Sequence, residues 1–429
     1  MTEGSTRADV TASSFLSKSK DYIRKMGSFS LNAKLFLVGS VLFSISGGIW
    51  GVIFNLYLID VGFRQDFVGY MLSVGEVAMG LGALPAGLLC DRIKRRRSFL
   101  LATLSGIVLG FVQVFTLNGT ILLVTSLLSG GISSALYIVA WAPFMVEHSS
   151  PKERVYLFSM SSVLGWVFGM VGNIIGGILP ETLAIFLKTS TSDFLVSRIT
   201  LICALAFQIA GLIPLYLIKE KMGSSSEQPK TFSFKNIKSK ATITKLVFAT
   251  ALMGLGSGFI VPLFNVFFQS KLGASKAEIG TIFALGQIGV AVGTLLMPAV
   301  AEKLGKVKTV SAVQLLSIPF ILAIVLSPNI AWATTPYIVR LSLMNMVGPL
   351  RDSFSMEVVH ASERATTSGL NGMAWSVLRA GGTAVAGEMM ESGDFFLPYL
   401  LTTVLYAASS ILYLFFFSQT KPVDSSEKT

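Results

Sequence analysis

The sequence predicts an all-α membrane protein with 12 transmembrane helices in two pseudo-symmetric six-helix bundles. Three observations support this fold class: high hydropathy, 12 long apolar stretches, and a repeat that relates the two halves of the chain. Of the 429 residues, 52% are hydrophobic and only 13% are charged, and the mean hydropathy is +0.69. Soluble globular proteins carry roughly a quarter charged residues. The composition therefore excludes a soluble fold, and it excludes a disordered chain because disorder requires low hydrophobicity.

The cysteines and the net charge exclude further classes of protein. Cys90 and Cys203 both lie inside long apolar runs, so we interpret them as small core residues and not as part of a disulfide framework. The formal net charge is +11. In so apolar a chain, this positive charge indicates loops that face an anionic membrane surface, and no nucleic-acid partner is expected.

A helix that crosses the hydrocarbon core needs about 20 mainly apolar residues, and 12 stretches meet this requirement. Helix is the expected conformation because each segment must satisfy its own backbone polar groups in lipid. Barrel strands would alternate strictly between apolar and polar residues, and these stretches do not. The expected spans are residues 35–58, 68–90, 98–117, 120–146, 156–179, 199–218, 245–268, 278–300, 309–327, 330–350, 366–390 and 396–417.

The N-terminal tail, residues 1–34, is polar and basic. The first span is too long, and starts too far from Met1, for a cleaved signal peptide. Between Phe15 and Met26, apolar residues recur at near-helical spacing among lysines and arginines. A short interfacial helix and a solvated basic tail both fit this pattern, and the sequence leaves the two open.

Lysines and arginines predict how the spans are oriented. With a cytoplasmic N-terminus, the inner segments hold 27 of the 34 Lys and Arg residues, and the outer loops hold 5. Cytoplasmic loops of membrane proteins carry such an excess. Both termini are therefore predicted to be cytoplasmic, and the expected location is the plasma or inner membrane of the cell.

The longest inner connection, residues 219–244, is rich in serine and lysine and predicts a flexible cytoplasmic linker. It divides the chain into an N-terminal bundle, residues 35–218, and a C-terminal bundle, residues 245–417, with a cytoplasmic tail at 418–429. A monomer is expected.

The two halves of the chain align with each other. At an offset of 210, Asn55 corresponds to Asn265, and at an offset of 211, Glu76 corresponds to Gln287. Parallel repeats of six spans, related by an axis along the membrane normal, occur in one large class of transporters. Matched positions in the first and seventh spans are expected to face each other across that axis.

The loop after the second span carries a specific resemblance. Residues 87–97 read GLLCDRIKRRR, which resembles the loop G-x-L-x-D-R-x-G-R-R-[KR] between the second and third helices of the major facilitator superfamily. Lys94 stands where that family usually has glycine, and the glycine occurs instead in the second-half copy, as Gly305. The resemblance covers all 12 spans, the linker and both loop copies, and it implies the fold of this family.

In the major facilitator superfamily this loop latches the cytoplasmic ends of the two halves together in the outward-facing state. The resemblance implies that role for both copies of the loop, although Pro298 replaces the first glycine in the second copy. The alternative is that the basic residues only set the topology. The expected cytoplasmic latch residues are Gly87, Asp91, Arg92, Arg95, Glu302, Lys303 and Lys306.

Charged residues also recur after the fourth and tenth spans, in matched positions of the two halves. They predict inner salt-bridge networks that break when the halves rock. Exposed, solvated charges that contribute little are the alternative. The residues concerned are Glu147, Glu153, Arg154, Glu357, Glu363 and Arg364.

The fifth span contains the segment 169–177, GMVGNIIGG, which resembles a glycine-rich motif of the family's fifth helix. The family links this motif to antiport, but Asn173 stands where many members have proline. Small residues at this spacing also form close-packing faces between helices. On these glycines alone, the sequence favours efflux over uptake.

Ionisable residues deep in a span are costly and are functional candidates. Four qualify: Glu76, Arg340, Arg379 and Glu388. Burial favours the protonated form of a carboxylate, so Glu76 is the candidate proton carrier. Arginine offers a charged planar fork to a carboxylate or phosphate, so Arg340 and Arg379 are candidate solute ligands. In the alternative, these arginines pair with Glu76 or Glu388 inside the protein.

Neutral side chains extend the candidate solute site. Asn55 and Asn265 either contact solute or form hydrogen bonds between helices. Four aromatic residues either line an amphiphilic pocket or pack against helices and lipid. These aromatic candidates are Trp50, Tyr137, Trp141 and Trp375.

The sequence contains no phosphate-binding G-x-x-x-x-G-K-[ST] segment and no nucleophile–base–acid constellation. His148 and His360 are too isolated for a metal site. No enzyme activity, cofactor or metal is therefore expected.

The sequence thus predicts a secondary transporter that moves a small amphiphilic or anionic organic solute by alternating access, with coupling to protons. Two alternatives remain: an uncoupled uniporter, and a transporter-fold protein that acts as a receptor or assembly factor without flux.

Overall fold

The computed structural model describes residues 29–219, 238–360 and 363–420. Within these ranges the chain forms helices and no strands. The pattern between Phe15 and Met26, most of the predicted linker and the last residues of the C-terminal tail lie outside the described residues.

The N-terminal half folds into six membrane-crossing segments in chain order. Several begin at a polar residue whose side chain accepts a hydrogen bond from the first turn, as Ser30 does at α2 and Asp193 at α8. The fourth segment is built from three consecutive pieces, with a π-helix in the middle. The elements are α2 (Leu31–Asp60), α3 (Gln65–Ile93), α4 (Arg95–Phe115), α5 (Gly119–Leu128), η1 (Ser129–Ser134), α6 (Ala135–Glu147), α7 (Pro151–Leu187) and α8 (Phe194–Leu217).

The C-terminal half repeats this order with more interruptions. Its seventh, ninth and tenth segments are each divided, and prolines stand at or near the breaks, where they remove a backbone donor. The elements are α9 (Lys240–Gly258), η2 (Val261–Leu263), α10 (Phe264–Leu272), α11 (Lys276–Leu304), α12 (Lys306–Leu316), α13 (Ile318–Val325), α14 (Ile330–Met346), α15 (Gly348–Glu357), α16 (Arg364–Glu391) and α17 (Phe396–Phe417).

Ten of the described segments are long and apolar enough by themselves to cross a membrane. The remaining two correspond to the predicted spans 330–350 and 366–390. The first is shortened because α14 ends at Met346 after 17 residues. The second, α16, is 28 residues long but rich in glycine, serine and threonine and carries Arg379 and Glu388. Both lie among the other helices, so the predicted 12-segment order holds.

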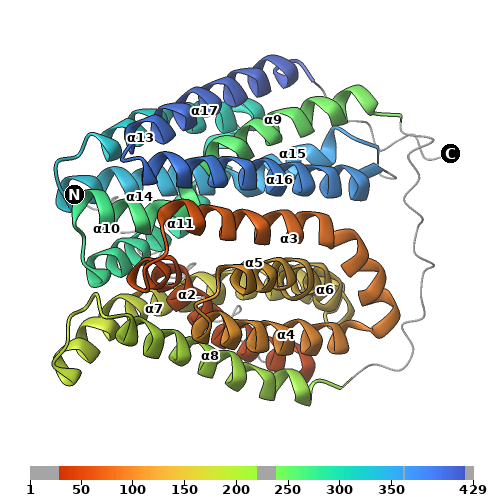
Figure 1. The fold of residues 1–429 in the computed structure, drawn as a ribbon. Helices are drawn as coiled ribbons and strands as arrows, with labels where there is room; N and C mark the ends of the chain where they lie inside the picture. The colour runs from red at the N-terminus through yellow and green to blue at the C-terminus, as the bar shows by residue number, and fades with distance from the viewer. Residues whose placement is uncertain (1–28, 220–237, 361–362, 421–429) are drawn as a thin grey trace, which may run out of the picture.

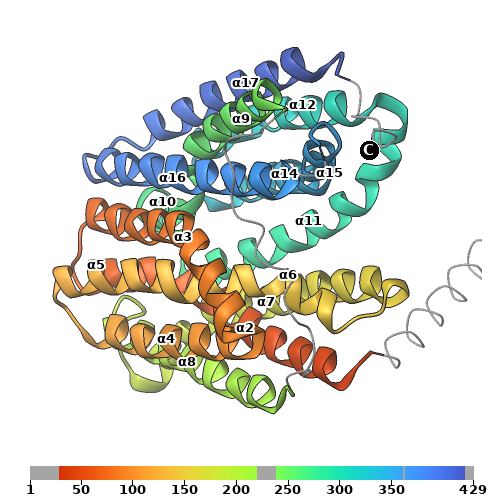
Figure 2. The same cartoon turned by 90° about the vertical axis from the view of Figure 1, so that its right-hand side faces the viewer.

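The two halves lie one above the other (Figure 1), and the view turned by 90° shows the same division, with α3 and α16 side by side at the boundary (Figure 2). We call one end of the bundle the linker end, because α8 ends there at Leu217 and α9 begins there at Lys240. It is at the right in Figure 1. The opposite end, where α2 ends at Asp60 and α11 begins at Lys276, is called the closed end.

Two seams join the halves, one between α3 and α16 and the other between α7 and α11. At the first seam a Cβ added to Gly69 would lie 2.8 Å from a backbone oxygen of α16, beside Gly387. At the second, a Cβ added to Gly280 would lie 2.4 Å from the carbonyl oxygen of Asn173, beside Gly177. Only glycine allows such close helix approach. The repeat offsets relate the two pairs, since 69 corresponds to 280 and 177 to 387.

Candidate functional site

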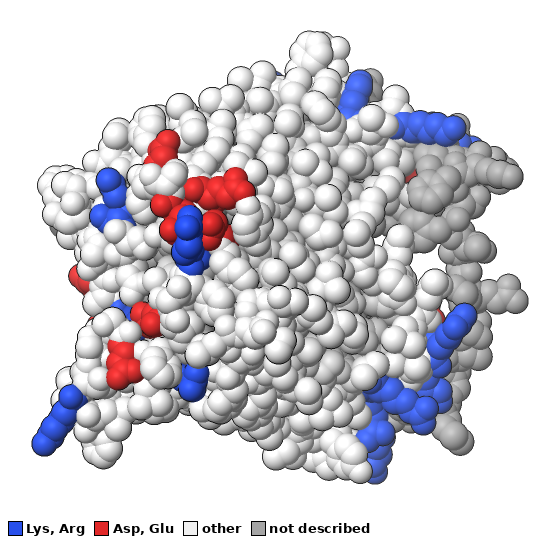
Figure 3. Space-filling view, viewed as in Figure 1, with Lys and Arg blue, Asp and Glu red and all other residues white. Residues whose placement is uncertain are grey.

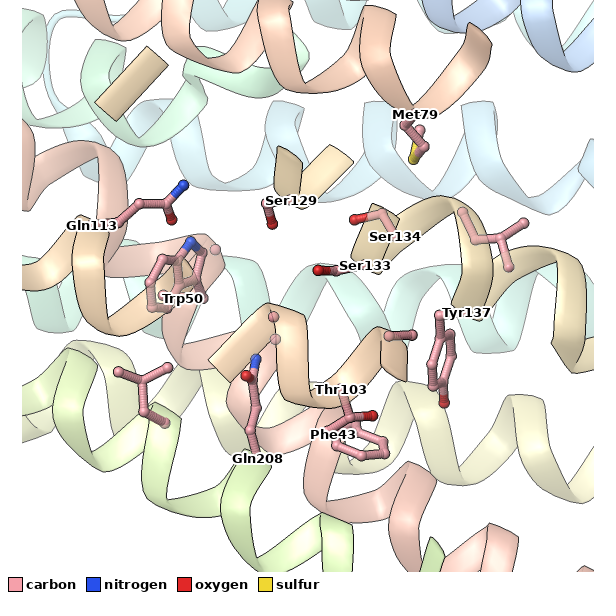
Figure 4. A pocket seen from close by; sticks show the side chains of 17 residues that line it. Phe43, Trp50, Met79, Thr103, Gln113, Ser129, Ser133, Ser134, Tyr137 and Gln208 are labelled. Atoms are coloured by element: carbon pink, nitrogen blue, oxygen red, sulfur yellow. The ribbon is translucent and has the colours of Figure 1, made fainter. Parts of the chain in front are cut away.

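A cavity of about 610 Å³ lies inside the N-terminal half, among α2, α3, α4, η1, α6 and α8. Its volume falls in the range of small-molecule sites. No Asp, Glu, Lys, Arg or His side chain lines it. Its polar groups are neutral, and Figure 4 shows them projecting from several helices around one space. They include those of Thr103, Gln113, Ser129, Ser133, Ser134 and Gln208, beside the polar groups of Tyr137 and Trp50.

Two glutamines bring unpartnered amide groups to this cavity. Gln113, on α4, is 6% exposed, and the structure gives its amide no hydrogen bond among the described residues. The Oε1 atom of Gln208, on α8, is buried and also lacks a hydrogen-bond partner. A buried polar atom without a partner costs free energy, which applies to Oε1 of Gln208. The amides of both glutamines supply neutral donors and acceptors to a polar ligand.

Aromatic rings form the other walls. Trp50 on α2 stacks on Phe54 with ring centroids 4.6 Å apart and an interplanar angle of 22°, which fixes the orientation of its indole. Tyr137 on α6 contacts Phe43 edge to face, with centroids 5.8 Å apart. The cavity therefore combines flat apolar surfaces with neutral hydrogen-bonding groups, an arrangement that fits an amphiphilic ligand.

A second cavity of about 320 Å³ adjoins the first and shares Phe43 and Tyr137 with it. Trp141 lines this smaller space and packs edge to face on Phe158, with centroids 5.1 Å apart. Its remaining walls are serine side chains of α2 and α7. Trp375 lies elsewhere. It belongs to α16 and stands under the guanidinium of Arg351, at 5.8 Å.

Glu76 and Arg379 form an ion pair across the seam between α3 and α16. Oε1 of Glu76 lies 2.9 Å from Nη1 of Arg379, and both side chains are largely buried. Oε2 of Glu76 and Nε of Arg379 are buried without hydrogen-bond partners. The pair lies where the helices still touch, between the hydrogen bond of Ser73 to the Ala380 carbonyl and the contact of Gly80 with α16. The carboxylate and the guanidinium are therefore joined by one short contact, while each keeps a buried polar atom without a hydrogen bond.

Arg340 is enclosed in the C-terminal half and is 2% exposed. Its Nη2 donates a hydrogen bond of 2.9 Å to the hydroxyl of Tyr406, and its guanidinium lies 5.4 Å from the ring centroid of Phe264. Cation–π contact is favourable for a desolvated arginine. Neither Arg340 nor Arg379 lines the two cavities. Glu388 lies at an exposed position, where the hydroxyl of Tyr70 donates to it.

Asn55 and Asn265 contact each other between the halves. Asn55 Nδ2 donates to Asn265 Oδ1 at 3.0 Å and to the Pro262 carbonyl at 2.9 Å. Asn265 Nδ2 donates to the Val52 carbonyl at 3.0 Å. Positions 52 and 262 are related by the same offset as 55 and 265, so each asparagine bonds the backbone of the other half in the same way. In this conformation both amides hold helices together.

A buried ion pair at the closed end was not anticipated from the sequence. Nζ of Lys276 lies 2.6 Å from Oδ2 of Asp60, and their side chains are 2% and 4% exposed. Lys276 also donates to the hydroxyl of Ser197 at 2.7 Å and to the Thr191 carbonyl at 2.6 Å. These contacts join the start of α11 to the N-terminal half. At the related positions, Gln65 donates to Ser270 at 3.2 Å in an exposed hydrogen bond.

Charged groups at the linker end pair within each half. Arg95 lies 2.8 Å from Asp91 and 3.3 Å from Glu147 in the N-terminal half. At the related positions of the C-terminal half, Lys306 pairs with Glu357. The hydrogen bond from Lys306 holds the pKa of the Glu357 carboxyl below its ordinary value.

The other predicted latch and network residues also remain within their own half or are exposed. A Cβ at Gly87 would meet only Val139, at 3.6 Å. Glu153 caps α7 with Ser150, Glu363 accepts from the backbone of Ser239 at 3.2 Å, and Arg364 donates to the Met356 carbonyl at 2.8 Å. The Nε atom of Arg154 is buried without a partner. The exposed residues are Arg92, Glu302 and Lys303.

The departure at Lys94 has a structural explanation. Lys94 has φ 70° and ψ 159°, and Gly305, at the related position, has φ 81° and ψ 152°. This region of backbone conformation is occupied almost only by glycine. The loop needs the same backbone geometry in both halves, and in the N-terminal half a lysine adopts it under strain.

The two ends of the molecule differ in charge. In the view of Figure 3, positive side chains gather at the right, which is the linker end, and acidic side chains cluster at the left, at the closed end. At the closed end Arg64 lies 3.0 Å from Glu391 and 3.4 Å from Asp66. On this face, few charged side chains of the described residues are visible between the two ends.

Comparison with known proteins identifies the family to which this architecture belongs. The family model described as Major Facilitator Superfamily matches residues 35–377 and, separately, residues 246–429. The chain belongs to the Major Facilitator Superfamily. It is a multi-pass membrane protein of a transporter family, as the loop at 87–97 led us to expect. A search of curated protein sequences finds no relative.

Solved structures of other members share the fold. A bacterial homolog of the human lysosomal transporter Spinster, in an inward-facing and occupied conformation, superposes with a TM-score of 0.71 at 14% identity, over 92% of this chain and 98% of that chain. The nucleoside transporter NupG superposes with a TM-score of 0.69 at 13% identity, over 91% of this chain and 100% of that chain. At these identities the superfamily resemblance concerns the fold.

Sequence reasoning missed the neutral polar walls of the cavity and the buried pair at the closed end. It searched the spans for ionisable residues, so the glutamines at 113 and 208 drew no attention. They were nevertheless visible as amides inside apolar stretches. Lys276 is one of the 5 outer-loop Lys and Arg residues of the predicted topology, since it stands just before a span and nothing in the sequence indicates that it is buried.

Proposed function

We propose that this protein moves a small, uncharged, amphiphilic solute through the membrane by alternating access, and that proton transfer at Glu76 is coupled to the movement. The single observation that carries the proposal is the cavity of about 610 Å³ lined by two glutamines and by aromatic rings, with no charged side chain. The proposed membrane is the plasma or inner membrane, and the proposed acting unit is a monomer.

The lining of the cavity favours an uncharged solute over an anionic one. An anion in a low-dielectric site needs a cationic partner, and none lines this cavity. Arg340 and Arg379, the predicted anion ligands, are engaged by Tyr406 and Glu76. A flat ring can lie against Trp50 while its polar edge bonds the amides of Gln113 and Gln208. Direct contact of the two arginines with solute remains a prediction for another conformation.

The orientation follows from charge. Positive residues gather at the linker end, and cytoplasmic surfaces carry such an excess. With the linker end in the cytoplasm, the closed end faces outward and the conformation is inward-facing. Latch contacts within each half fit this state, because the latch is expected to join the halves when the protein faces outward.

The ion pair of Glu76 and Arg379 supplies the proposed coupling step. It crosses the seam between α3 and α16, so the seam can open only if the pair separates. Protonation of Glu76 removes its charge and weakens its attraction to Arg379. A proton that arrives at Glu76 therefore lowers the cost of opening this seam. Asn55 and Asn265 would separate in the same movement, and the orientation of a solute by these amides remains a prediction.

A binding screen tests the solute class. Purified protein in detergent is heated with uncharged ring compounds and with charged analogues, for example uridine against its 5′-monophosphate. We expect uncharged compounds to raise Tm and the charged analogues to leave it unchanged. Trp50→Ala and Gln208→Ala should abolish the shift. Trp332→Ala is the matched control, because Trp332 is 69% exposed and belongs to α14 of the C-terminal half, outside the cavity lining. Equal shifts by the anionic analogues would overturn the uncharged class.

A flux measurement tests coupling. The binding compound is loaded into proteoliposomes, and a pH gradient is imposed. Wild-type flux should follow the gradient, and Glu76→Gln should remove that response. Glu388→Gln, an exposed carboxylate near the other end of the same seam, should retain it. Flux that ignores the gradient in the wild type would identify a uniporter, and binding without any flux would identify a receptor or assembly protein.

The same vesicles decide the direction of transport. Efflux was favoured on the glycines of the fifth span, and these glycines have a packing role that does not depend on direction. A Cβ on Gly172 would lie 2.2 Å from the carbonyl oxygen of Ile45. We retain efflux as a prediction, to be measured with vesicles in which the linker end faces out.

A further inference from the structure

One wall of the cavity is a short π-helix, η1, between α5 and α6. Its geometry is defined by a hydrogen bond from the amide of Ala135 to the carbonyl of Gly130, five residues earlier. π-helical turns of this kind are rare and are frequent at functional sites. This one brings Ser129, Ser133 and Ser134 to the cavity.

Glycines of the segment let η1 pack closely against α3. Gly130 presses against α3 so closely that a Cβ would lie 2.0 Å from the carbonyl oxygen of Gly75. The next residue, Gly131, has its carbonyl oxygen 2.8 Å from where a Cβ on Gly82 would lie. Two glycines facing α3 allow the backbone to approach and to widen by one residue. The sequence Ser-Gly-Gly-Ile-Ser-Ser thus places small residues on α3 and hydroxyls on the other side.

The widened turn determines which serines share a face. In an α-helix, residues four apart are neighbours on one face, whereas residues five apart diverge. In a π-helix the hydrogen bond joins residues five apart, so Ser134 stays on the same side as Ser129. Figure 4 shows the two side chains on the same rim of the cavity, with Ser133 beneath them. A regular α-helix would turn Ser134 away.

The hydroxyl groups differ in their partners. Ser133 is bonded to Ser105 at 2.8 Å. The structure gives no hydrogen bond to the hydroxyls of Ser129 and Ser134 among the described residues. Gln113, 6% exposed and equally unpartnered, lines the same cavity. Each of these hydroxyls can both donate and accept a hydrogen bond. They can therefore bind a hydroxyl group of a solute, whereas a hydrocarbon group would leave them without a partner.

We propose that η1 is a hydroxyl-recognition face and that the solute joins a flat ring, held at Trp50 and the glutamines, to a hydroxyl-bearing part held by Ser129 and Ser134. This inference rests on the proposed function of the cavity and narrows its solute class. Nucleosides and aryl glycosides have both a flat ring and a hydroxyl-bearing part, whereas simple aromatic compounds have only the ring.

Matched pairs of solutes test the proposal. Binding to the purified protein is measured for uridine against 2′,3′-dideoxyuridine and for phenyl β-glucoside against phenol. We expect at least one hydroxyl-bearing member to bind about tenfold more tightly than its partner, the difference that a hydrogen bond of ordinary strength makes. Ser129→Ala and Ser134→Ala should each reduce this preference. Ser190→Ala, on an exposed loop where the hydroxyl bonds only Ser192, should not.

The outcomes separate the two proposals. If the hydroxyl-free compounds bind the cavity as well as their partners, or if both serine variants keep full preference, the recognition face is overturned and the uncharged solute class stands. If no compound binds, both fail. Deleting Ile132, which is 38% exposed, removes the extra residue of the turn. A folded deletion variant should retain binding of phenol-type rings and lose the preference for hydroxyls.

Discussion

The two seams between the halves have the same architecture and different chemistry. Each has a glycine pair at its closest approach, Gly69 with Gly387 and Gly280 with Gly177. Each also has a carboxylate that accepts a backbone amide from the other half: Glu391 accepts from Gln65 at 2.9 Å, and Glu181 accepts from Ala277 at 3.2 Å. The glycine pair and the carboxylate–amide hydrogen bond that join the halves therefore occur at both seams.

The charges are not duplicated. Glu76 and Arg379 pair at the seam between α3 and α16, but the related positions hold Gln287 and Gly169, which cannot form an ion pair. Conversely, Lys276 and Asp60 form a buried pair where the related positions have only Gln65 and Ser270. The repeat therefore determines how the halves fit, whereas single substitutions in one copy supply the ion pair at which proton transfer is proposed and the ion pair that joins the halves at the closed end.

The largest expected effect concerns the two related contacts at the closed end, the Lys276–Asp60 ion pair and the Gln65–Ser270 hydrogen bond. Lys276→Ala leaves Asp60 buried without its partner, which costs about 3 to 5 kcal/mol. We expect a large loss of thermal stability in detergent and greater access of water-soluble reagents to cysteines placed at the closed end. Gln65→Ala removes the related exposed hydrogen bond and should cost at most about 1 kcal/mol.

The double variant Asp60→Asn with Lys276→Gln sharpens this comparison. It removes both charges and should recover much of the lost stability, because the damage comes from an unpaired buried charge. If Lys276→Ala were no worse than Gln65→Ala, the buried pair would not hold the closed end.

The glycine pairs should behave alike in the two seams. Gly280→Ala and Gly69→Ala each place a Cβ within 3 Å of the opposing backbone. We expect each to cost about 1 to 3 kcal/mol, as overpacking does, measured by thermal unfolding. Gly372→Ala is the control, since nothing lies within 4 Å of its added Cβ. If only one of the two glycine substitutions lowered stability, the two seams would not be equivalent in packing.

The strained loop offers a stabilising change. Lys94→Gly places glycine where the backbone is glycine-like in both halves, and it should raise stability by about 1 kcal/mol through relief of strain. Gly305→Ala should lower stability, because it introduces the same strain into the C-terminal half. Thermal unfolding of both variants measures this. A loss of stability in Lys94→Gly would show that the interactions of the lysine side chain outweigh the strain.

The smallest effects are expected at the linker end. Arg95→Ala and Lys306→Ala each break a partly exposed ion pair, and such pairs contribute about 0 to 1 kcal/mol. The pKa of Glu357 is lowered in the folded protein by Lys306. Its contribution to stability is therefore present above the ordinary pKa of a glutamate and is lost as the pH falls through the lowered value.

A comparison of unfolding temperatures at neutral and acidic pH checks this sign. In Lys306→Ala, the drop in unfolding temperature between neutral and acidic pH should be smaller than in the wild type, because the part that comes from the Lys306–Glu357 pair is gone. An unchanged acid profile in this variant would contradict the role of the Lys306–Glu357 pair.

Hydropathy and the internal repeat predict most of the fold, because the bilayer imposes length and apolar character on each span. The match of Asn55 to Asn265 also anticipated that these residues meet between the halves, since symmetry brings equivalent positions to the axis. The resemblance at residues 87–97 led to the family. All of these signals are periodic or local, and they are therefore visible in a single sequence.

The cavity could not be predicted in the same way. A glutamine or serine in a span is inexpensive, so Gln113, Gln208 and Ser134 do not stand out as Glu76 does. The π-turn depends on how closely Gly130 approaches α3, and that is a tertiary contact. Lys276 is buried by segments distant in sequence, Asp60 and Ser197 among them. Whether a boundary residue is a solvated loop charge or an internal bridge is decided by packing alone.

Every wall of the larger cavity belongs to helices α2 to α8. If this cavity binds the solute as proposed, the solute stays with the N-terminal half during transport, and the C-terminal half moves against it. Changes confined to residues 240–417 should then alter turnover and leave affinity nearly constant, whereas changes near Trp50 should alter affinity first. Recognition of the solute would then lie in one half of the protein and the larger movement in the other, although the two halves repeat one sequence pattern.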